Sequence, residues 1–291
     1  MRFRKILCPT DFSPASERAV GIAARLAKDA DAELVLFHAW YVPAASHAGS
    51  ASGPSVVDDV KGDADRALTA AARDATRAGA RHVTTRLANG VPWSLIVHAL
   101  EEDGFDLCVM GTVGQTSLSR VLLGSVAGKL IRHAPCSVLV VHPQSSLAPF
   151  AHVLCPTDFS ASARHALERV TSLVPAGGRI TLLHVIELPL ATSGEVTMPD
   201  LAHVLDRESA EALEAWAALL ASTTALAVTT RSRIGYPGAQ TLAALETDPS
   251  IDLVVMGSHG RSGITRALMG SVAEKVARHA TCPVLVARAR S

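Results

Sequence analysis

The stretch Val255–Val272, VMGSHGRSGITRALMGSV, decides how the rest of the chain is interpreted. It overlaps the end of a short apolar run, Ile251–Met256, which predicts a buried strand, and continues with Gly257 and Gly260. Nine further residues follow, and then Gly270 and the serine after it open an apolar helix. Glycine lets backbone N–H groups approach a ligand closely, and a helix N-terminus supplies unpaired N–H donors and a positive dipole end. The spacing therefore predicts a polyphosphate held between a glycine loop and a helix N-terminus.

The same spacing occurs earlier in the chain, which indicates an internal repeat. CPTDFS stands at Cys8–Ser13 and again at Cys155–Ser160, an offset of 147 residues. Other pairs recur at an offset of 146, namely His38 and His184, Asp106 and Asp252, and Gly124 and Gly270. The chain is therefore two copies of one module. We expect domains at residues 1–143 and 150–291, joined by the linker-like stretch His142–Phe150, HPQSSLAPF.

Each copy alternates strand and helix patterns, which predicts the α/β class. The strands expected in the first copy are Phe3–Cys8, Glu33–Ala39, His82–Leu87, Phe105–Met110 and Ser137–Val141. Helices are expected after Ser13-Pro14, from Val60, from Pro92 and over Val121–Ala134, with loops at Pro43–Val57 and Leu188–Pro199 and a last strand at Pro283–Ala287. Each domain should thus be a doubly wound, five-stranded parallel sheet with helices on both faces, and we expect the strand order 3-2-1-4-5. If strands one and four are neighbours at the switch point, both motifs face one ligand crevice at the carboxyl ends of these strands.

Composition limits the function classes. The chain has 291 residues, 48% of them apolar, and a formal net charge of zero, which is typical of a globular protein and does not suggest nucleic acid as a partner. Apolar runs such as Val138–Val141 are too short to span a membrane. The start, MRFRKILCPTDFS, lacks the long apolar run of a signal peptide, which favours a cytoplasmic protein. Five scattered cysteines predict reduced, buried thiols.

Together these residues resemble the universal stress protein family. The motif of that family, Gly-x2-Gly-x9-Gly-Ser/Thr after an early Asp, is present in both halves, as is the typical sequel SVAEKVARHATCPVLV at Ser271–Val286. The resemblance covers both halves from end to end and implies a tandem member. Family members with this motif are typically adenine-nucleotide binders. The resemblance therefore implies ATP, ADP or AMP as the bound molecule, with Mg²⁺ entering only together with ATP.

The resemblance also implies site residues. In the second half it assigns Pro156, Thr157 and Asp158 to the adenosine, the backbone around Val185 to the adenine edge, Met256, Gly257, Gly260, Gly270, Ser271 and Val272 to the phosphates, and Arg261 to a charged phosphate contact. The corresponding first-half residues are Pro9, Thr10, Asp11, Ala39, Met110, Gly111, Gly114, Gly124, Ser125 and Val126. Val113 and Gln115 stand where the second half has His259 and Arg261, so the first half loses a positive charge.

Each motif also has a structural interpretation. Glycines after a strand serve as turn residues, Ser125 and Ser271 as helix caps, Asp11 and Asp158 as braces of the first turn, and Arg261 as a solvated surface charge. His38 and His184, at strand ends, are expected to be packed, hydrogen-bonded histidines rather than metal ligands. The P-loop and dinucleotide fingerprints are absent. No catalytic base stands beside the phosphate motif, so fast turnover is not expected.

The expected function is that of a cytoplasmic, non-catalytic stress-response protein that binds an adenine nucleotide as a signal or switch. A slow ATPase is one alternative, and a scaffold with vestigial nucleotide sites that acts through partner proteins is another. Single-module relatives commonly dimerise through strand five. We therefore expect Ser137–Val141 to pair with Pro283–Ala287 in an intramolecular pseudo-dimer, because unpaired apolar edges are a liability. A homodimer of whole chains is the alternative assembly.

The two halves should differ in affinity. Arg261 can give a charge-assisted phosphate contact worth roughly 1.5–3 kcal/mol, less where it is exposed, whereas Gln115 offers only a neutral hydrogen bond. Gly124→Asp and Gly270→Asp variants each leave one site for calorimetry, and we expect the second-half site to bind ATP more tightly. Equal or tighter binding by the first half would contradict this ranking.

Overall fold

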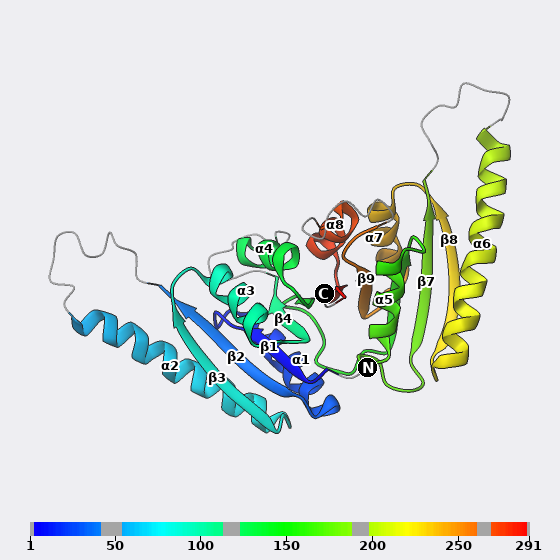
Figure 1. Cartoon of the computed structure of the whole chain (residues 1–291). Helices are drawn as coiled ribbons and strands as arrows, with labels where there is room; N and C mark the ends of the chain where they lie inside the picture. Colours follow the sequence, from blue (N-terminus) through cyan, green and yellow to red (C-terminus); the bar gives the residue numbers. More distant parts are fainter. Residues whose placement is uncertain (1–2, 42–53, 113–122, 188–197, 261–268, 290–291) are drawn as a thin grey trace. The chain divides into compact units, whose positions relative to one another are not determined.

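The computed structural model describes residues 3–41, 54–112, 123–187, 198–260 and 269–289 (Figure 1). Its strands form from short apolar runs, and its helices begin at helix-start signals in the sequence. One unit extends to Leu147 and the other covers Ala148–Ala289. The strands of the first unit are β1 (Lys5–Pro9), β2 (Glu33–Trp40), β3 (His82–Asn89), β4 (Leu107–Gly111) and β5 (Ser137–Val141). Its helices are α1 (Pro14–Ala30), α2 (Pro54–Arg77), α3 (Pro92–Glu102) and α4 (Ser125–His133).

The second unit repeats this order of elements. Its strands are β6 (His152–Thr157), β7 (Arg179–Ile186), β8 (Ala227–Ile234), β9 (Leu253–Gly257) and β10 (Val284–Ala287). Its helices are α5 (Ala161–Val170), α6 (Met198–Thr223), α7 (Pro237–Thr247) and α8 (Ser271–His279). The CPTDFS repeat ends the first strand of each unit, and the first glycine of the glycine motif ends the fourth.

The strands within each unit pair in parallel, and the first strand lies between the second and the fourth. The orders are β3-β2-β1-β4-β5 and β8-β7-β6-β9-β10. The predicted order 3-2-1-4-5 is therefore confirmed in both units. The predicted pairing of Ser137–Val141 with Pro283–Ala287 concerns the two units relative to each other and stays a prediction.

The direction of each crossover decides which face of the sheet a helix covers, because parallel β-α-β connections are right-handed. In the first unit α1 and α2 lead toward β3 and pack against each other. Helices α3 and α4 lead in the opposite direction, toward β5, and also pack against each other. The two pairs therefore cover opposite faces, which is the expected doubly wound arrangement.

The helix after the glycine motif begins later than the sequence predicts. The prediction was Val121–Ala134, whereas α4 begins at Ser125, and Val121 itself lies outside the described residues. Gly124 is extended, with ψ of 155°, and donates its N–H to the Thr112 carbonyl at 2.7 Å. An extended residue cannot be part of the helix, so the first helical hydrogen bond runs from Gly128 to the Gly124 carbonyl.

The helix before β3 begins earlier than predicted. Helix α2 starts at Pro54, inside the predicted loop Pro43–Val57 and six residues before the predicted helix start at Val60. Proline suits the first helical position because its φ is already helical and its missing N–H is not needed there. Likewise α6 starts at Met198, inside the predicted loop Leu188–Pro199. The remainder of both loops lies outside the described residues, and strand limits differ from prediction by no more than two residues.

Continuous apolar strands form the core of each unit. Ile6, Leu7 and Cys8 of β1 are fully buried, as are most of their neighbours in β2 and β4. All five cysteines are buried free thiols, which confirms that prediction. Burial raises the pKa of the Cys8 and Cys155 thiols far above the usual range, because a thiolate there would lose its hydration. These thiols are therefore packing groups.

The repeated aspartates tie the amino ends of neighbouring strands together. Asp106 accepts from the backbone N–H groups of Arg4 and Lys5 at 2.8 and 3.1 Å. Asp252 does the same for Ala151 and His152 at 2.7 and 3.1 Å. The recurrence of this residue in the sequence thus has a structural cause, at the end of the sheet opposite to the glycine motif.

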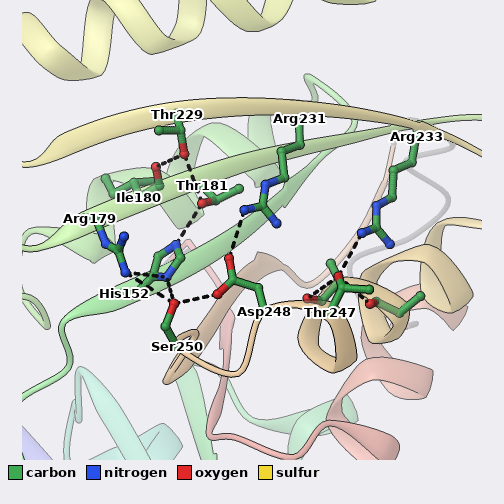
Figure 2. Close-up of polar contacts among 12 residues, drawn as sticks. His152, Arg179, Ile180, Thr181, Thr229, Arg231, Arg233, Thr247, Asp248 and Ser250 are labelled. Atoms are coloured by element: carbon green, nitrogen blue, oxygen red, sulfur yellow. Dashed lines mark hydrogen bonds and ion pairs between the residues drawn. The ribbon is translucent and has the colours of Figure 1, made fainter.

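A network of polar side chains closes the same end of the second sheet (Figure 2). Buried His152 has Nδ1 3.0 Å from the Ser250 hydroxyl and Nε2 2.9 Å from the Thr181 hydroxyl. Ser250 donates to Asp248 at 2.5 Å, and Arg231 forms a 2.9 Å ion pair with that carboxylate. Since the Ser250 proton is given to Asp248, the serine oxygen is left to accept hydrogen bonds from the donors around it.

His152 should make the stability of the second unit depend on pH. Burial and then the Arg179 guanidinium lower its pKa below the ordinary value of 6.5, against the opposing carboxylates of Asp248 and Asp252. Below pH 6.5 the unfolded chain therefore binds the proton more readily than the folded chain, and stability falls as the pH falls. Urea titrations at pH 7.5 and 5.5 should show that wild type loses more stability on acidification than His152→Gln does.

An exposed histidine supplies the matched control for that measurement. His279 ends α8 of the same unit and is exposed, so His279→Gln controls for the loss of a histidine outside the network. If His152→Gln loses as much stability on acidification as wild type does, another group causes the loss.

Candidate functional site

The turn after β1 is held by its own side chains. Thr10 Oγ1 accepts from the Phe12 N–H at 3.1 Å, and the Asp11 carboxylate accepts from the Ser13 N–H at 3.1 Å and its hydroxyl at 2.6 Å. Ser13 then caps α1, with Pro14 at the first helical position, as predicted. Phe12 has a φ of +61°, a left-handed conformation that is unfavourable for a bulky side chain. The hydrogen bonds on either side stabilise it.

The second unit builds the same turn after β6. Phe159 has a φ of +63° and donates its N–H to Thr157 Oγ1 at 3.0 Å. Asp158 accepts from the Ser160 N–H at 3.0 Å, and Ser160 caps α5. The predicted structural role of the aspartates, as braces of the first turn, is thus real. One carboxylate offers about four acceptor positions, so this role leaves ligand contact open.

A histidine on the second strand supports each turn. His38 Nδ1 lies 2.7 Å from the Thr10 carbonyl oxygen, and His184 Nδ1 lies 2.8 Å from that of Thr157. This confirms the expectation of packed, hydrogen-bonded histidines. Among the residues that the structure describes, no group of three or more His, Cys, Asp or Glu side chains could hold a metal ion.

The first glycine of each motif is required by packing. A Cβ on Gly111 would lie 2.8 Å from the backbone of Ala15 in α1, and one on Gly257 would lie 2.5 Å from Ser162 Oγ in α5. The start of α1 or α5 therefore occupies the space that a side chain at this glycine would need. At these two positions glycine permits close contact between a strand and a helix.

The later glycines occupy different surroundings. A Cβ on Gly260 would lie 2.9 Å from the Asp158 carboxylate, so the glycine loop and the aspartate turn are in direct contact. A Cβ on Gly270 would lie 3.4 Å from the Ser258 carbonyl, an ordinary contact distance. Gly270 has a φ of −63°, which any residue adopts. Packing therefore explains Gly260 and leaves Gly270 unexplained.

The helix after the motif opens toward the aspartate turn without a side-chain cap. Gly124 and Gly270 are the N-cap residues of α4 and α8, and neither helix has a side-chain cap hydrogen bond among the described residues. The Gly124 N–H donates to the Thr112 carbonyl at 2.7 Å, and the Gly270 N–H donates to the Ser258 carbonyl at 2.9 Å. The first-turn N–H groups and the helix dipole thus make an anion site available.

These elements border one cavity in each unit. The cavity of the second unit, about 810 Å³, is lined by the predicted residues Pro156, Thr157, Asp158, Val185, Met256, Gly257, Gly260, Gly270, Ser271 and Val272. The cavity of the first unit, about 570 Å³, is lined by the predicted residues Pro9, Thr10, Asp11, Ala39, Met110, Gly111, Gly124, Ser125 and Val126. Gly114 and Arg261 lie outside the described residues. The structure therefore gathers every described candidate around a cavity, and contact with a ligand stays a prediction.

Sequence reasoning missed other residues that line the cavities. Phe159 and His184 belong to the repeats, so their recurrence was a usable signal. Ser209 and Thr241 line the second cavity from α6 and α7, whereas Ala64 and Ile96 line the first from α2 and α3. These helix positions carry no motif, because only the packing of each helix on the sheet directs them to the cavity.

The chain matches known proteins along most of its length. The model of the universal stress protein family matches residues 2–142 and again residues 149–288. The chain belongs to the universal stress protein family. Universal stress protein Rv2623 of Mycobacterium tuberculosis is 30% identical over 294 residues, which cover 97% of this chain and 96% of that protein. Universal stress protein MJ0531 of Methanocaldococcus jannaschii is 37% identical over 140 residues, 48% of this chain and 82% of that protein.

A solved structure supports the same fold. The crystal structure of a universal stress protein from Archaeoglobus fulgidus is 24% identical, with a TM-score of 0.69, and the match covers 98% of each chain. At this identity the likeness concerns the fold alone. The tandem universal stress protein architecture inferred from the sequence is therefore confirmed. Within the described part of the chain, no helix has both the length and the apolar character needed to cross a membrane.

The different surroundings of the glycines predict different costs of substitution. Gly257→Ala should destabilise the second unit by about 1–3 kcal/mol, because its Cβ would meet the backbone of α5. Gly270→Ala should change the stability by less than about 1 kcal/mol, because the reduced freedom of the unfolded chain offsets the poorer capping by alanine. Urea unfolding of the two variants tests this directly. Equal losses would mean that Gly270 is also required by packing.

Proposed function

We propose that each unit binds one adenine nucleotide, ATP or the related ADP or AMP, and that the protein is a non-catalytic stress-response binder whose occupancy acts as a signal or switch. One observation carries the proposal. In both units a helix N-terminus without a side-chain cap and an aspartate-bearing turn border the same cavity. The first suits phosphate and the second suits sugar hydroxyls.

At the phosphate end, the N–H groups of Ser271 and Val272 and the Ser271 hydroxyl would donate to phosphate oxygens. Ser271 is exposed at the start of α8, so its hydroxyl is accessible. Glu274 in the first turn is paired with Arg278 at 2.9 Å, which offsets its negative charge. Arg261 would add a further positive charge. Ser125 and Val126 would play the same parts in the first unit.

At the nucleoside end, Asp158 would accept hydrogen bonds from ribose hydroxyls. Val185 lies at the end of β7, where backbone groups would meet the adenine edge. Pro156 and Met256 supply apolar contacts on the two strands between which the cavity opens. In the first unit Asp11, Ala39, Pro9 and Met110 correspond to these residues.

Mg²⁺ would enter together with ATP. Hard cations prefer oxygen ligands and usually retain several waters, so phosphate oxygens would hold the ion with little help from the protein. Sustained phosphate release above that of a control with Gly270 and Ser271 both replaced would indicate slow hydrolysis of bound ATP. Absence of nucleotide binding would favour a scaffold role.

We also propose that the two halves form an intramolecular pseudo-dimer and that the protein works in the cytoplasm. The match of the family to both halves supports the first point. The pairing of β5 with β10 would remove two apolar strand edges.

Replacing Gly270 by Asp should abolish nucleotide binding in the second unit without unfolding it. The carboxylate would lie where phosphates approach, so like charges would repel. The fold should accept the change, because the φ of −63° and the 3.4 Å contact leave room for a side chain. A carboxylate at a helix N-terminus also stabilises by about 0.3–1 kcal/mol. Calorimetry with ATP and the melting temperature of the apo protein measure the two effects.

Gly270→Ala separates charge from shape, since it adds a Cβ without a charge and should retain most of the affinity. Arg261→Gln should weaken ATP more than adenosine, because it removes only a phosphate contact. Wild-type ATP affinity of the second unit in the Asp variant would mean that this helix N-terminus is not the phosphate site. Absence of ATP binding in wild type would favour the scaffold role.

A further inference from the structure

Each unit places a histidine of the second strand beneath the turn that bears the aspartate. His38 Nδ1 lies 2.7 Å from the Thr10 carbonyl oxygen, and His184 Nδ1 lies 2.8 Å from the Thr157 carbonyl oxygen. A carbonyl oxygen only accepts, so Nδ1 carries a proton in both units. The hydrogen bond thus joins the carboxyl end of the first strand to that of the second.

The ring of the same histidine supports a residue in an unfavourable conformation. Phe12 packs on His38, and Phe159 packs on His184, each with ring centroids 4.6 Å apart and tilts of 33° and 34°. Both phenylalanines have a positive φ, near +60°. Such a conformation costs about 1–2 kcal/mol for an ordinary residue, so it persists only where neighbours hold it.

The threonine and the phenylalanine flank the aspartate on either side. The histidine fixes the carbonyl of the residue before Asp158 and the ring of the residue after it. The turn's own hydrogen bonds, from Phe159 and Ser160 to Thr157 and Asp158, bend the chain locally. The histidine supplies, in both units, a contact from another strand that sets the bent turn against the sheet.

We propose that His38 and His184 are positioning residues for nucleotide binding, which rests on the function proposed above. Through the Nδ1–H bond and the ring contact, each histidine holds the turn so that Asp11 or Asp158 faces the cavity. It acts on the nucleoside end. The phosphate end has separate support, because the Gly270 N–H is bonded to the Ser258 carbonyl. Loss of the histidine should therefore weaken nucleoside recognition and spare phosphate recognition.

Two substitutions separate the hydrogen bond from the ring. Asparagine places its side-chain N–H₂ at the position of Nδ1 and lacks the ring, whereas phenylalanine keeps a ring and has no donor. In full-length protein carrying Gly124→Asp, which leaves the second cavity to be measured, His184→Phe should weaken ATP and adenosine by about tenfold each, the loss of one hydrogen bond of about 1.4 kcal/mol. His184→Asn should stay within about threefold of the parent. Inorganic tripolyphosphate, measured by competition with ATP, should bind all three proteins equally.

Ser250→Ala provides the structural control. Ser250 belongs to the network at the opposite end of the same sheet, so its loss should lower the melting temperature without changing any of the three affinities (Figure 2). If His184→Phe does not fold, His184→Gln replaces it, because the longer side chain puts its amide at the Nε2 position. Mirror variants at His38 in the Gly270→Asp background repeat the test in the first unit.

The outcomes are distinct. Lack of ATP binding by the Gly124→Asp parent would refute the proposed function of the second cavity itself. Binding by the parent together with unchanged affinity in His184→Phe would overturn the positioning role. Equal losses in the Asn and Phe variants, or a parallel loss of tripolyphosphate, would also overturn it, since the hydrogen bond or the selective action on the turn would then be absent. Rescue by Asn with a selective loss in Phe supports it.

Discussion

The pairing of the first strand with the fourth is the constraint on which the rest of each unit depends. In the first unit Ile6 and Leu7 face Leu107 and Cys108, and in the second Val153 and Leu154 face Leu253 and Val254. The connections lead away from the first strand toward one edge of the sheet and away from the fourth strand toward the other edge. The helices of the two sets therefore cover opposite faces and leave a crevice at the carboxyl ends of these strands. Two motifs about 100 residues apart in sequence meet there for that reason alone. Asp106 and Asp252 also join the amino ends of these strands, because their carboxylates accept hydrogen bonds from backbone N–H groups at the start of the first strand.

Glycine has three different physical roles within one short motif. Gly257 removes a side chain that would collide with α5, and Gly260 leaves room for the Asp158 carboxylate. Gly270 has no such neighbour, and its φ is open to any residue. The motif therefore combines two positions that packing requires to be glycine with one position that packing leaves unexplained.

The two units share the turn at the carboxyl end of the sheet and the aspartate contact at its amino end, but differ in the other side chains at the amino end. The turn, the histidine and the left-handed phenylalanine agree within 0.1 Å and 2°. At the other end, Lys5 pairs with Glu33 and lies over the Phe105 ring, whereas His152 joins a hydroxyl network. In the cavity walls, Ala64 and Ile96 of the first unit correspond to Ser209 and Thr241 of the second. Duplication has thus preserved the geometry at the cavity and let the supporting contacts and the wall chemistry vary.

The sequence by itself determined the repeat, the alternation of strands and helices and the motif residues at each cavity, because strand patterns, helix-start signals and turn motifs act over short distances. CPTDFS at Cys8–Ser13 encodes a strand end, a turn and a helix cap in six neighbouring residues. Tertiary structure decided the start of α4 at Ser125, since that depends on a hydrogen bond from Gly124 to Thr112. It also decided which glycines are required by packing and that His184 supports the turn before Phe159. Those facts depend on distances between residues far apart in the chain, and no local pattern contains them.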